Sequence, residues 1–453
     1  MVTASPIPEA FGARLSRHWG ALFHLAWPVV FSRAGLVVMA VADVVMTGRY
    51  DTEALAALSL GYAVTMPLLV TAIGCMVGII ATAAREHGAG GREGPAIALR
   101  GLRWAVAVGT VAGLLCLLAG PVLQLVGQAP ALVAGGAAVA LMIAPGTLFQ
   151  VAFVAAGFYL EGTGRPRPGL WAMAGANVLN VVLNWLMIGG NLGFPAMGAK
   201  GAALATTLAR GAMVAGLLVW MLRLPEFAPW RGRLTLWGPG GWNAGTEMRR
   251  IGYAGGAAYF FETVAFATLA QAAGLLGATA LAAYTILHNI ETMVFMVALG
   301  VSVATAFRIG QAAGAGEPAE ARFAGLAGAA AAMGLVGLLG LALLAAAPSV
   351  VGFYSEDEGL IARAAPIMAI LAVSMVFDAG QVVLGQSTRA LRDSWGTTLC
   401  FFLAFFCVML PVALVLAFHT PLAEAGLFIG TAIGCMAAVA LLVRRFLTLV
   451  GRV

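Results

Sequence analysis

Residues 53–90 read EALAALSLGYAVTMPLLVTAIGCMVGIIATAAREHGAG, and residues 279–316 read TALAAYTILHNIETMVFMVALGVSVATAFRIGQAAGAG. The two stretches align without a gap at an offset of 226 residues, and both end in Gly-Ala-Gly. Segments rich in Ala and Gly match easily by chance, so their placement carries more weight than their identity. Each copy follows the first apolar stretch of its half, and the offset is about half of the 453 residues. We therefore interpret the chain as containing an internal repeat.

The composition is that of an integral membrane protein. The chain is 61% hydrophobic and 10% charged, whereas an ordinary soluble domain is about 25% charged. A membrane-spanning helix needs about 20 mainly apolar residues. Twelve stretches meet this requirement, approximately at residues 21–47, 55–82, 101–126, 131–159, 170–190, 199–222, 250–275, 281–306, 322–350, 362–387, 395–418 and 421–443.

The repeat and the spans together predict an all-α membrane protein with two six-helix lobes, residues 1–226 and 227–453. Six spans is an even number, so both lobes start from the same side of the membrane. They should be related by a pseudo-two-fold axis along the membrane normal. Segment 224–248 is rich in Pro and Gly, which is typical of a linker. This arrangement favours alternating access, in which the lobes rock around a central cavity.

The basic residues predict the orientation. If the N-terminus is inside the cell, 20 of the 25 Lys and Arg residues, Arg389 among them, fall in cytoplasmic loops, as the positive-inside rule requires. The remaining five lie in outer loops or within spans: Arg49, Lys200, Arg363, Arg33 and Arg210. Both termini and the linker should therefore be cytoplasmic. The net charge of +6 follows from this topology and does not indicate a nucleic-acid partner.

The five cysteines all lie in apolar segments, and none forms a CxxC pair. We interpret them as small packing residues, with no disulfide framework and no zinc site.

Four acidic residues lie inside the apolar stretches: Asp43, Glu262, Glu291 and Asp378. A carboxylate in hydrocarbon costs several kcal/mol, so such residues usually mark an ion, proton or substrate path. The alternative is a polar contact that only holds helices together.

Glu262 shares a helix face with Tyr259 at i−3 and Phe266 at i+4. A carboxylate between aromatic rings suits a hydrophobic cation, through charge pairing and cation–π contact.

Asp378 has Gln381 at i+3 and Ser374 at i−4, so oxygen ligands lie along one stripe. If the fold brings Glu262 close to Asp378, the two carboxylates could bind Na⁺ or share a proton.

Asp43 lies in the outer third of the first span. Asn177, Asn180 and Asn184 fall on one face of the fifth span and could form an amide lining opposite Asp43. The alternative is that these amides only join helices by hydrogen bonds.

Glu291 is a candidate to pair with Arg33 or Arg210, which would make it structural. Arg33 lies about 15 Å along a helix from Asp43, too far for direct pairing. Pro28 should kink the first span.

Three motifs in the first half resemble a known family. Residues 27–50, WPVVFSRAGLVVMAVADVVMTGRY, contain Pro28 and the pattern Asp-x-x-Met-x-Gly at Asp43, Met46 and Gly48. EGTGRPRP ends the fourth span, and GFPAMGAKGAALAT joins the fifth span to the sixth. In order, these elements resemble the multidrug and toxic compound extrusion (MATE) transporters, in their bacterial NorM-like branch.

The second half continues the resemblance. The seventh span carries Phe-Phe-Glu at Phe260, Phe261 and Glu262, and the tenth reads FDAGQVVLGQSTRALRD, ending near Arg389 and Asp393. The chain departs from the family where a proline is common early in the seventh span and where Ser374 replaces a common tyrosine. Arg33 and Glu291 are also unusual.

The resemblance implies a monomeric antiporter of the bacterial inner membrane that exports cationic amphipathic drugs as Na⁺ or H⁺ enters. It implies cation coupling at Glu262 and Asp378, with Na⁺ a candidate ligand of both, and at Asp43. It also implies that bending at Pro28 matters, and it implies no resident cofactor. The cavity-lining candidates are Tyr259, Phe266, Gln381, Asn177, Asn180, Asn184 and Glu291.

Other functions have less support from the sequence. A lipid or polysaccharide flippase of the same superfamily would bind anionic head groups, for which Arg33 and Arg210 are suited but the buried acids are not. No GxxxxGK[ST] loop indicates ATP-driven transport. No Ser/His or His/Glu arrangement indicates an enzyme.

Overall fold

The computed structural model describes residues 11–91, 93–230, 241–354 and 357–451. Regular structure within these residues is helical throughout. Residues 231–240 of the expected linker lie outside the described part, as do Arg92 and Arg452.

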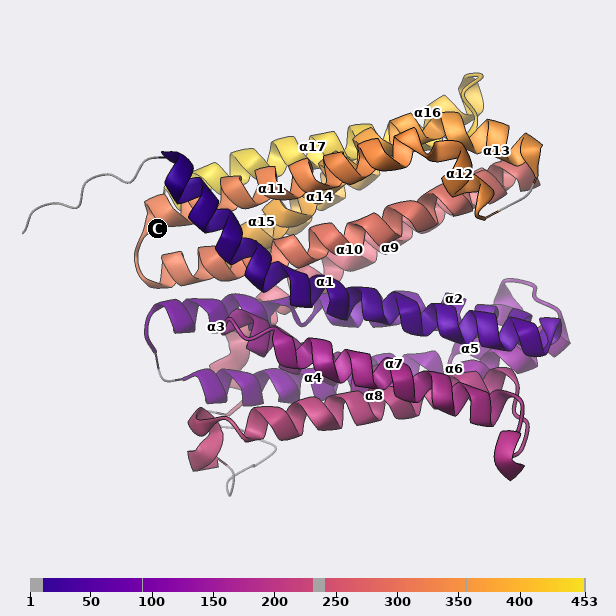
Figure 1. Ribbon diagram of the computed structural model, residues 1–453, viewed down its shortest axis with the longest axis horizontal. Helices are drawn as coiled ribbons and strands as arrows, with labels where there is room; N and C mark the ends of the chain where they lie inside the picture. Colours follow the sequence, from indigo (N-terminus) through magenta and orange to yellow (C-terminus); the bar gives the residue numbers. More distant parts are fainter. Residues whose placement is uncertain (1–10, 92, 231–240, 355–356, 452–453) are drawn as a thin grey trace, which may run out of the picture.

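The helices form two layers, with α1–α8 in one and α9–α17 in the other (Figure 1). The first layer, which we call the first lobe, contains α1 (Phe11–Tyr50), α2 (Thr52–Gly74), α3 (Val77–Gly88), α4 (Gly94–Cys116), α5 (Ala119–Leu125), α6 (Pro130–Gly162), α7 (Arg167–Ile188) and α8 (Ala199–Leu222). The second lobe contains α9 (Thr246–Leu275), α10 (Ala278–Gly314), α11 (Pro318–Ala345), α12 (Ala347–Gly352), α13 (Glu358–Ala364), α14 (Met368–Ala390), α15 (Ser394–Phe402), α16 (Leu410–His419) and α17 (Glu424–Val450).

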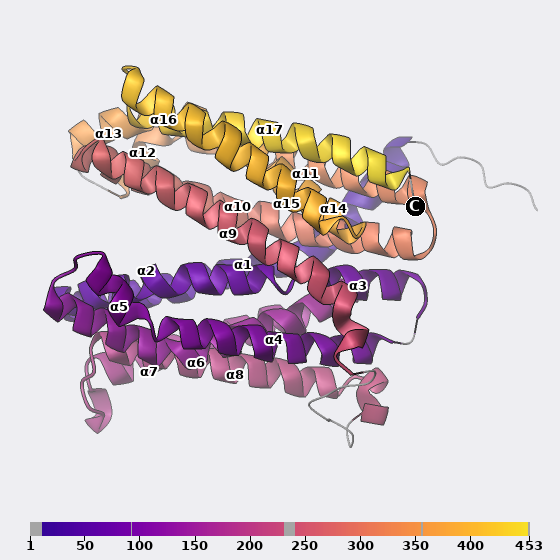
Figure 2. The ribbon, with the colours of Figure 1, turned by 180° about the vertical axis from the view of Figure 1, so that it is seen from behind.

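These helices make the twelve expected spans, because several pairs of consecutive helices continue one another as a single rod. In the described residues, α2 continues into α3, α4 into α5, α11 into α12 and α13 into α14, and a π-helical segment, Leu403–Met409, joins α15 to α16. Eleven of the rods are long and apolar enough to cross a membrane. The twelfth is α9, which is 30 residues long but has its apolar residues diluted by Gly, Tyr, Glu262 and Gln271. It runs from the second lobe toward α3 and α4 of the first (Figure 2), where the rings of Tyr253 and Trp104 lie 5.1 Å apart.

The start of α1, the end of α17 and the segment between α8 and α9 lie at the same end of the molecule (Figures 1 and 2). We call this the linker end and the opposite one the distal end. A lobe with an even number of spans begins and ends on the same side, so the observed layout agrees with the topology expected from the repeat.

The two lobes meet at the linker end through glycines. A Cβ atom on Gly88 of α3 would collide with Gln311 of α10, and a Cβ on Gly314 of α10 would collide with Arg85 of α3. The offset of 226 residues converts Gly88 into Gly314 and Arg85 into Gln311, so these two contacts are one contact repeated. Ala84 and its repeat mate Gly310 contact each other.

The same reciprocity holds nearer the middle of the membrane. A Cβ on Gly74 would crowd Gly256 of α9, and a Cβ on Gly300 of α10 would crowd Val30 of α1. The offset relates Gly74 to Gly300 and Val30 to Gly256. The contacts between lobes therefore follow the pseudo-two-fold axis that the sequence repeat predicts. Small residues at these positions allow the helix backbones to approach closely.

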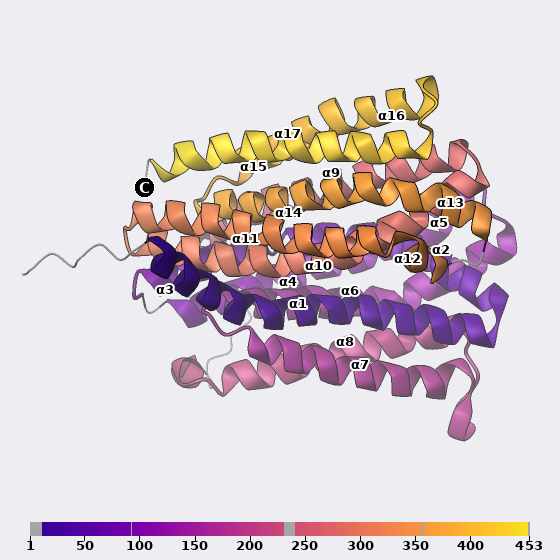
Figure 3. The ribbon, with the colours of Figure 1, turned by 45° about the horizontal axis from the view of Figure 1, so that its top comes forward.

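Helix α1, like α9, crosses from one lobe to the other in the described structure. It continues through Pro28 without a break, and its first part turns toward α11 of the second lobe (Figures 1 and 3). Trp19 Nε1 donates to the carbonyl of Ala327 on α11 at 3.4 Å. Proline lacks the N–H that would bond to the preceding turn, which accounts for the change of direction.

Candidate functional site

Asp43 of α1 is completely buried and accepts hydrogen bonds from three other helices. Tyr62 Oη of α2 donates to Oδ2 at 2.6 Å, and Thr206 Oγ1 of α8 donates to the same oxygen at 2.5 Å. Asn180 and Asn184 of α7 donate their Nδ2 groups to Oδ1 at 3.0 and 2.7 Å. The carboxylate therefore joins four helices of the first lobe, which we call the Asp43 cluster.

Arg210 of α8 supplies positive charge to this cluster. The residue is buried, and it interacts electrostatically with Asp43 and with Tyr62. Its Nε has no hydrogen-bond partner among the described residues. A buried carboxylate is expensive without such compensation, so Arg210 belongs to the site that the sequence suggested at Asp43.

Asn177 does not join the Asp43 cluster, so its expected place in the amide lining is wrong. Its Nδ2 donates to the carbonyl of Met173 at 3.0 Å, and its side chain lies beside Gly35 of α1. Gly35 is eight residues before Asp43, about 12 Å along the helix. Asn177 shares the face of Asn180 and Asn184, but it lies seven residues, about 10 Å along the helix, from Asn184 and so at a different depth.

Arg33 of α1 pairs with Glu161 of α6. Arg33 Nη2 lies 3.2 Å from both carboxylate oxygens of Glu161, and each side chain is only 8% exposed. The guanidinium also lies 5.1 Å from the ring centre of Phe158. The expected pairing of Glu291 with Arg33 or Arg210 is therefore wrong.

Glu161 is a further buried acid, which the sequence interpretation placed at a helix end. The fourth span was expected to end at residue 159, but α6 continues to Gly162, and Glu161 turns inward. The neighbouring residues Arg165 and Pro166 are typical of a loop, so nothing in the sequence indicated that Glu161 is buried.

Glu262 of α9 faces Arg389 of α14 across the lobe. Glu262 is half-buried, and the two groups interact electrostatically. Arg389 is 2% exposed, with its guanidinium carbon 5.3 Å from the ring centre of Phe401 and 6.0 Å from that of Tyr259. The expectation that Arg389 lies in a cytoplasmic loop is wrong, because the last turn of α14 carries it inward.

Asp378 of α14 is buried and lies near both other acids of its lobe. Gln381 Nε2 donates to Asp378 Oδ1 at 2.8 Å, and Glu291 and Glu262 both act electrostatically on the Asp378 carboxylate. Ser374 Oγ and Gln381 Oε1 are buried without a hydrogen-bond partner in the described part of the chain. Oxygen atoms left without donors are what a bound cation or proton would satisfy.

The described residues contain no group of three or more His, Cys, Asp or Glu side chains placed to hold a metal ion. A Na⁺ ion at Asp378 would therefore need neutral oxygens such as those of Ser374 and Gln381 beside one carboxylate. Oxygen ligands of this kind are suited to hard cations.

Glu291 and Phe266 both contact His288 of α10. His288 Nδ1 lies 3.3 Å from Glu291 Oε2, and the ring of Phe266 stacks on the imidazole with centroids 5.4 Å apart. Phe266 also lies 6.3 Å from Phe405 in the core of the second lobe. Tyr259 instead accepts a bond of 3.5 Å from Gln386 Nε2. Tyr259 and Phe266 share a helix face, but they are two turns apart and contact different neighbours.

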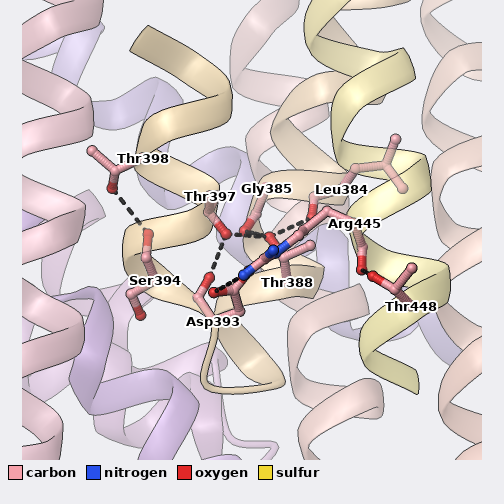
Figure 4. Close-up of polar contacts among 9 residues, drawn as sticks. All are labelled: Leu384, Gly385, Thr388, Asp393, Ser394, Thr397, Thr398, Arg445 and Thr448. Atoms are coloured by element: carbon pink, nitrogen blue, oxygen red, sulfur yellow. Dashed lines mark hydrogen bonds and ion pairs between the residues drawn. The ribbon is translucent and has the colours of Figure 1, made fainter. Parts of the chain in front are cut away.

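The end of the tenth-span motif forms a structural corner (Figure 4). Arg445 of α17 pairs with Asp393 through Nε–Oδ2 at 2.5 Å and Nη2–Oδ1 at 3.1 Å. Thr388 and Thr397 hydroxyls lie 2.6 Å apart beneath this pair and join α14 to α15. These contacts position the helix that carries Arg389 and Asp378.

Two cavities lie at the linker end, away from the buried acids. One of about 710 Å³ lies between α1, α7 and α8, with His24, Trp171 and Trp220 in its lining. Another of about 360 Å³ lies between the lobes and is lined by polar groups that include Glu86 and Arg392. Neither contains Asp43, Glu262 or Asp378, so the site is defined by its buried polar groups.

Comparison with known proteins assigns the class. The MatE family model matches residues 28–186 and 256–419, one stretch in each half of the repeat. The chain is 34% identical to the probable multidrug resistance protein NorM of Caulobacter vibrioides over 434 residues, covering 94% of this chain and 90% of that one. The multidrug resistance protein PmpM of Pseudomonas aeruginosa is 29% identical over 450 residues, covering 96% and 92%.

Solved structures share the fold. The eukaryotic MATE transporter AtDTX14 superposes with a TM-score of 0.85 at 17% identity, covering 97% of this chain and 99% of that one. The Vibrio cholerae MATE transporter VcmN in its bent form gives 0.84 at 19% identity, covering 97% and 98%. The chain therefore belongs to the MatE family, and the resemblance inferred from its motifs is confirmed.

Proposed function

We propose that this protein is a multidrug efflux transporter that exchanges an entering cation, Na⁺ or H⁺, for a cationic amphipathic compound. The observation that carries the proposal is the set of buried acids with unsatisfied neighbours: Asp378 beside the unpartnered oxygens of Ser374 and Gln381. Such groups in a membrane interior are costly unless they bind something in turn. The relatives named as multidrug resistance proteins support the same function.

Export would proceed by rocking of two lobes, residues 1–226 and 227–453. The lobes touch at the linker end through glycine contacts, so separating them there while closing the distal end would expose the site alternately to each side. The bend of α1 at Pro28 would let that helix follow either lobe. Charge pairing with Glu262 and contact with Tyr259 would hold the substrate.

We place the protein in the bacterial inner membrane as a monomer, with the linker end and both termini in the cytoplasm. The excess of Arg in the loops at that end supports this orientation. The site is suited to transport, and the proposal assigns it no catalytic reaction and no resident cofactor.

The flippase alternative loses the feature that favoured it. Arg33 is bonded to Glu161, and Arg210 faces Asp43. Neither is a free cation for an anionic head group, so no separate observation now favours that function.

The test is efflux of ethidium from vesicles containing the purified protein, under an imposed Na⁺ gradient or an imposed pH gradient. We expect at least one gradient to accelerate efflux over protein-free vesicles. An absence of acceleration under both gradients, in protein shown to be folded by its thermal unfolding transition, would contradict the proposal.

Replacement of Asp43 by Asn is expected to reduce cation-driven efflux by about tenfold or more, because the amide cannot take up or release a proton or bind a cation as strongly. Asn184→Ala, which removes one donor and keeps the charge, is the matched control and should have a smaller effect. Efflux at the wild-type rate in the Asp43→Asn variant would show that the Asp43 cluster is structural.

A further inference from the structure

His288 and Glu291 form a pair that connects the surface of the second lobe to its interior. The side chain of His288 is 38% exposed and that of Glu291 is 5% exposed, with Nδ1 and Oε2 3.3 Å apart. The other carboxylate oxygen, Oε1, is buried and has no hydrogen-bond partner among the residues that the structure describes. One end of the pair is exposed at the surface of the lobe, and the other ends on an atom with no hydrogen-bond partner among the described residues.

Two aromatic rings fix the imidazole in this position. Tyr284 stacks on it with ring centroids 5.7 Å apart and an angle of 13° between planes, and Phe266 of α9 lies 5.4 Å away at 28°. Tyr284 is held in turn by Phe428 of α17 at 5.3 Å. The two stacking contacts restrict the imidazole ring, whose Nδ1 faces Glu291.

The repeat gives independent support. The offset of 226 residues places His288 at the position of Tyr62 in the first lobe, and Tyr62 donates its hydroxyl proton to the buried Asp43. Both lobes thus use a polar ring at this position against a buried carboxylate. Tyrosine keeps its proton near neutral pH, whereas histidine gains and loses one between about pH 5 and 8.

The charged groups around the pair are mostly acidic. Glu291 acts on Asp378 of α14, on Tyr284 and on Cys435 of α17, and Glu262 of α9 acts on Asp378. Nearby basic groups are occupied: Arg363 of α13 pairs with Glu424 of α17, and Arg33 of α1 pairs with Glu161. The remaining charged groups of α3 and α11 lie at the linker end, namely Arg85, Glu86, Glu320 and Arg322.

The position of His288 along α10 is suited to proton entry from the distal side. His288 is ten residues from the distal end of α10, about 15 Å, and Glu291 is one turn deeper. Asp378 lies deeper again, twelve residues from the linker end of α14. The three groups form a descending order from the distal side into the lobe.

We propose that His288 takes up a proton from solution on the distal side and passes it from Nδ1 to Oε2 of Glu291, from which Asp378 is protonated. Uptake forms an N–H bond at Nε2 of the neutral Nδ1–H imidazole, and transfer to Glu291 breaks the Nδ1–H bond and forms an O–H bond at Oε2. This leaves the neutral Nε2–H tautomer, and exchange with water, which removes the Nε2 proton and supplies one to Nδ1, restores the starting tautomer. The inference rests on the proposed export function and specifies H⁺ as its coupling ion. His288 is a relay for that ion and does not contact the exported compound.

The experiment compares wild-type protein with His288→Ala in vesicles, measuring ethidium efflux driven by a pH gradient at several pH values on the distal side. We expect the variant to be about tenfold slower near pH 7.5, where protons are scarce, and close to wild type near pH 5.5, where water can deliver them. Imidazole added on the distal side should restore the rate near pH 7.5, since it fits the space left between two aromatic rings.

His87→Ala is the matched control, because His87 also lies against a ring, Phe307 at 5.9 Å, but on α3 at the linker end. It should leave the pH profile unchanged. If His288→Ala does not fold, as judged by thermal unfolding, Glu291→Gln replaces it and should lose efflux over the same pH range.

The outcomes separate this inference from the proposed function. An unchanged pH profile in His288→Ala, or a rate that imidazole does not restore, would overturn the relay. So would wild-type efflux driven by Na⁺ alone, although export itself would then stand. If wild-type vesicles show no efflux under either gradient, the proposed function fails first.

Discussion

Glu262→Gln and Asp378→Asn are each expected to reduce cation-driven efflux to the level of protein-free vesicles. Both amides keep the size of the side chain but cannot carry the charge that changes during a transport cycle. Asp378 is buried beside oxygens that have no donors in the described structure, so removing its charge leaves no anionic ligand there. Vesicle efflux under each gradient measures the effect.

The two variants should differ in what they lose. Glu262 is half-buried next to the ring of Tyr259, so Glu262→Gln should also weaken ethidium binding by about tenfold through lost charge pairing and cation–π support. Asp378→Asn should bind ethidium nearly as well as wild type. Fluorescence titration of purified protein in detergent separates the two effects.

Glu53→Gln is the control, because Glu53 is an exposed acid in the first turn of α2. It should transport at the wild-type rate. Coupled efflux that survives undiminished in both Glu262→Gln and Asp378→Asn would remove the second lobe from the proposed ion path.

Breaking the buried pair of Arg33 and Glu161 is expected to destabilise the protein strongly. Each side chain is 8% exposed, and removing one partner of a buried ion pair typically costs about 3–5 kcal/mol because the other charge stays buried alone. Arg33→Met and Glu161→Met should therefore both unfold at much lower concentrations of denaturing detergent.

The double variant Arg33→Met/Glu161→Met tests whether the pair itself matters. Replacing both partners by apolar residues is often neutral or stabilising, so the double variant should recover most of the stability lost in either single one. A double variant as unstable as the worse single variant would show that each residue has a separate essential contact. Efflux by a stable double variant would mark the pair as structural.

Much of the fold follows from the sequence because hydropathy and the repeat are properties of the whole chain. Twelve apolar stretches and an offset of half the length define the spans and the symmetry. The seventh span, 250–275, was predicted from its apolar residues, although the corresponding helix α9 is too polar to count among the eleven clearly apolar spans. Helix ends were less predictable, and Glu161 and Arg389 were misplaced because both lie in the last turn of a helix.

A shared helix face was not enough to predict the site contacts, because the position along the helix axis also decides which residues meet. Asn180 and Asn184 are four residues apart and reach Asp43 together, while Asn177 faces Met173 and Gly35. The partner of Glu291 was sought in distant arginines, although His288 lies three residues away on the same helix. Contacts between helices, such as that of Arg33 with Glu161, depend on packing that one sequence does not reveal.

The reciprocal glycine contacts between the lobes have a consequence for the origin of this chain. A contact that repeats itself on exchange of the halves is what two identical copies would make when they face each other. An ancestral gene half as long would have encoded a six-helix protein that paired with itself through the positions now occupied by Gly88 and Gly314. Duplication and fusion then freed each copy to diverge. The backbone contacts were inherited by both copies, while Asp43 in one and Glu262 in the other now stand opposite leucines, Leu269 and Leu36, in the alignment of the halves.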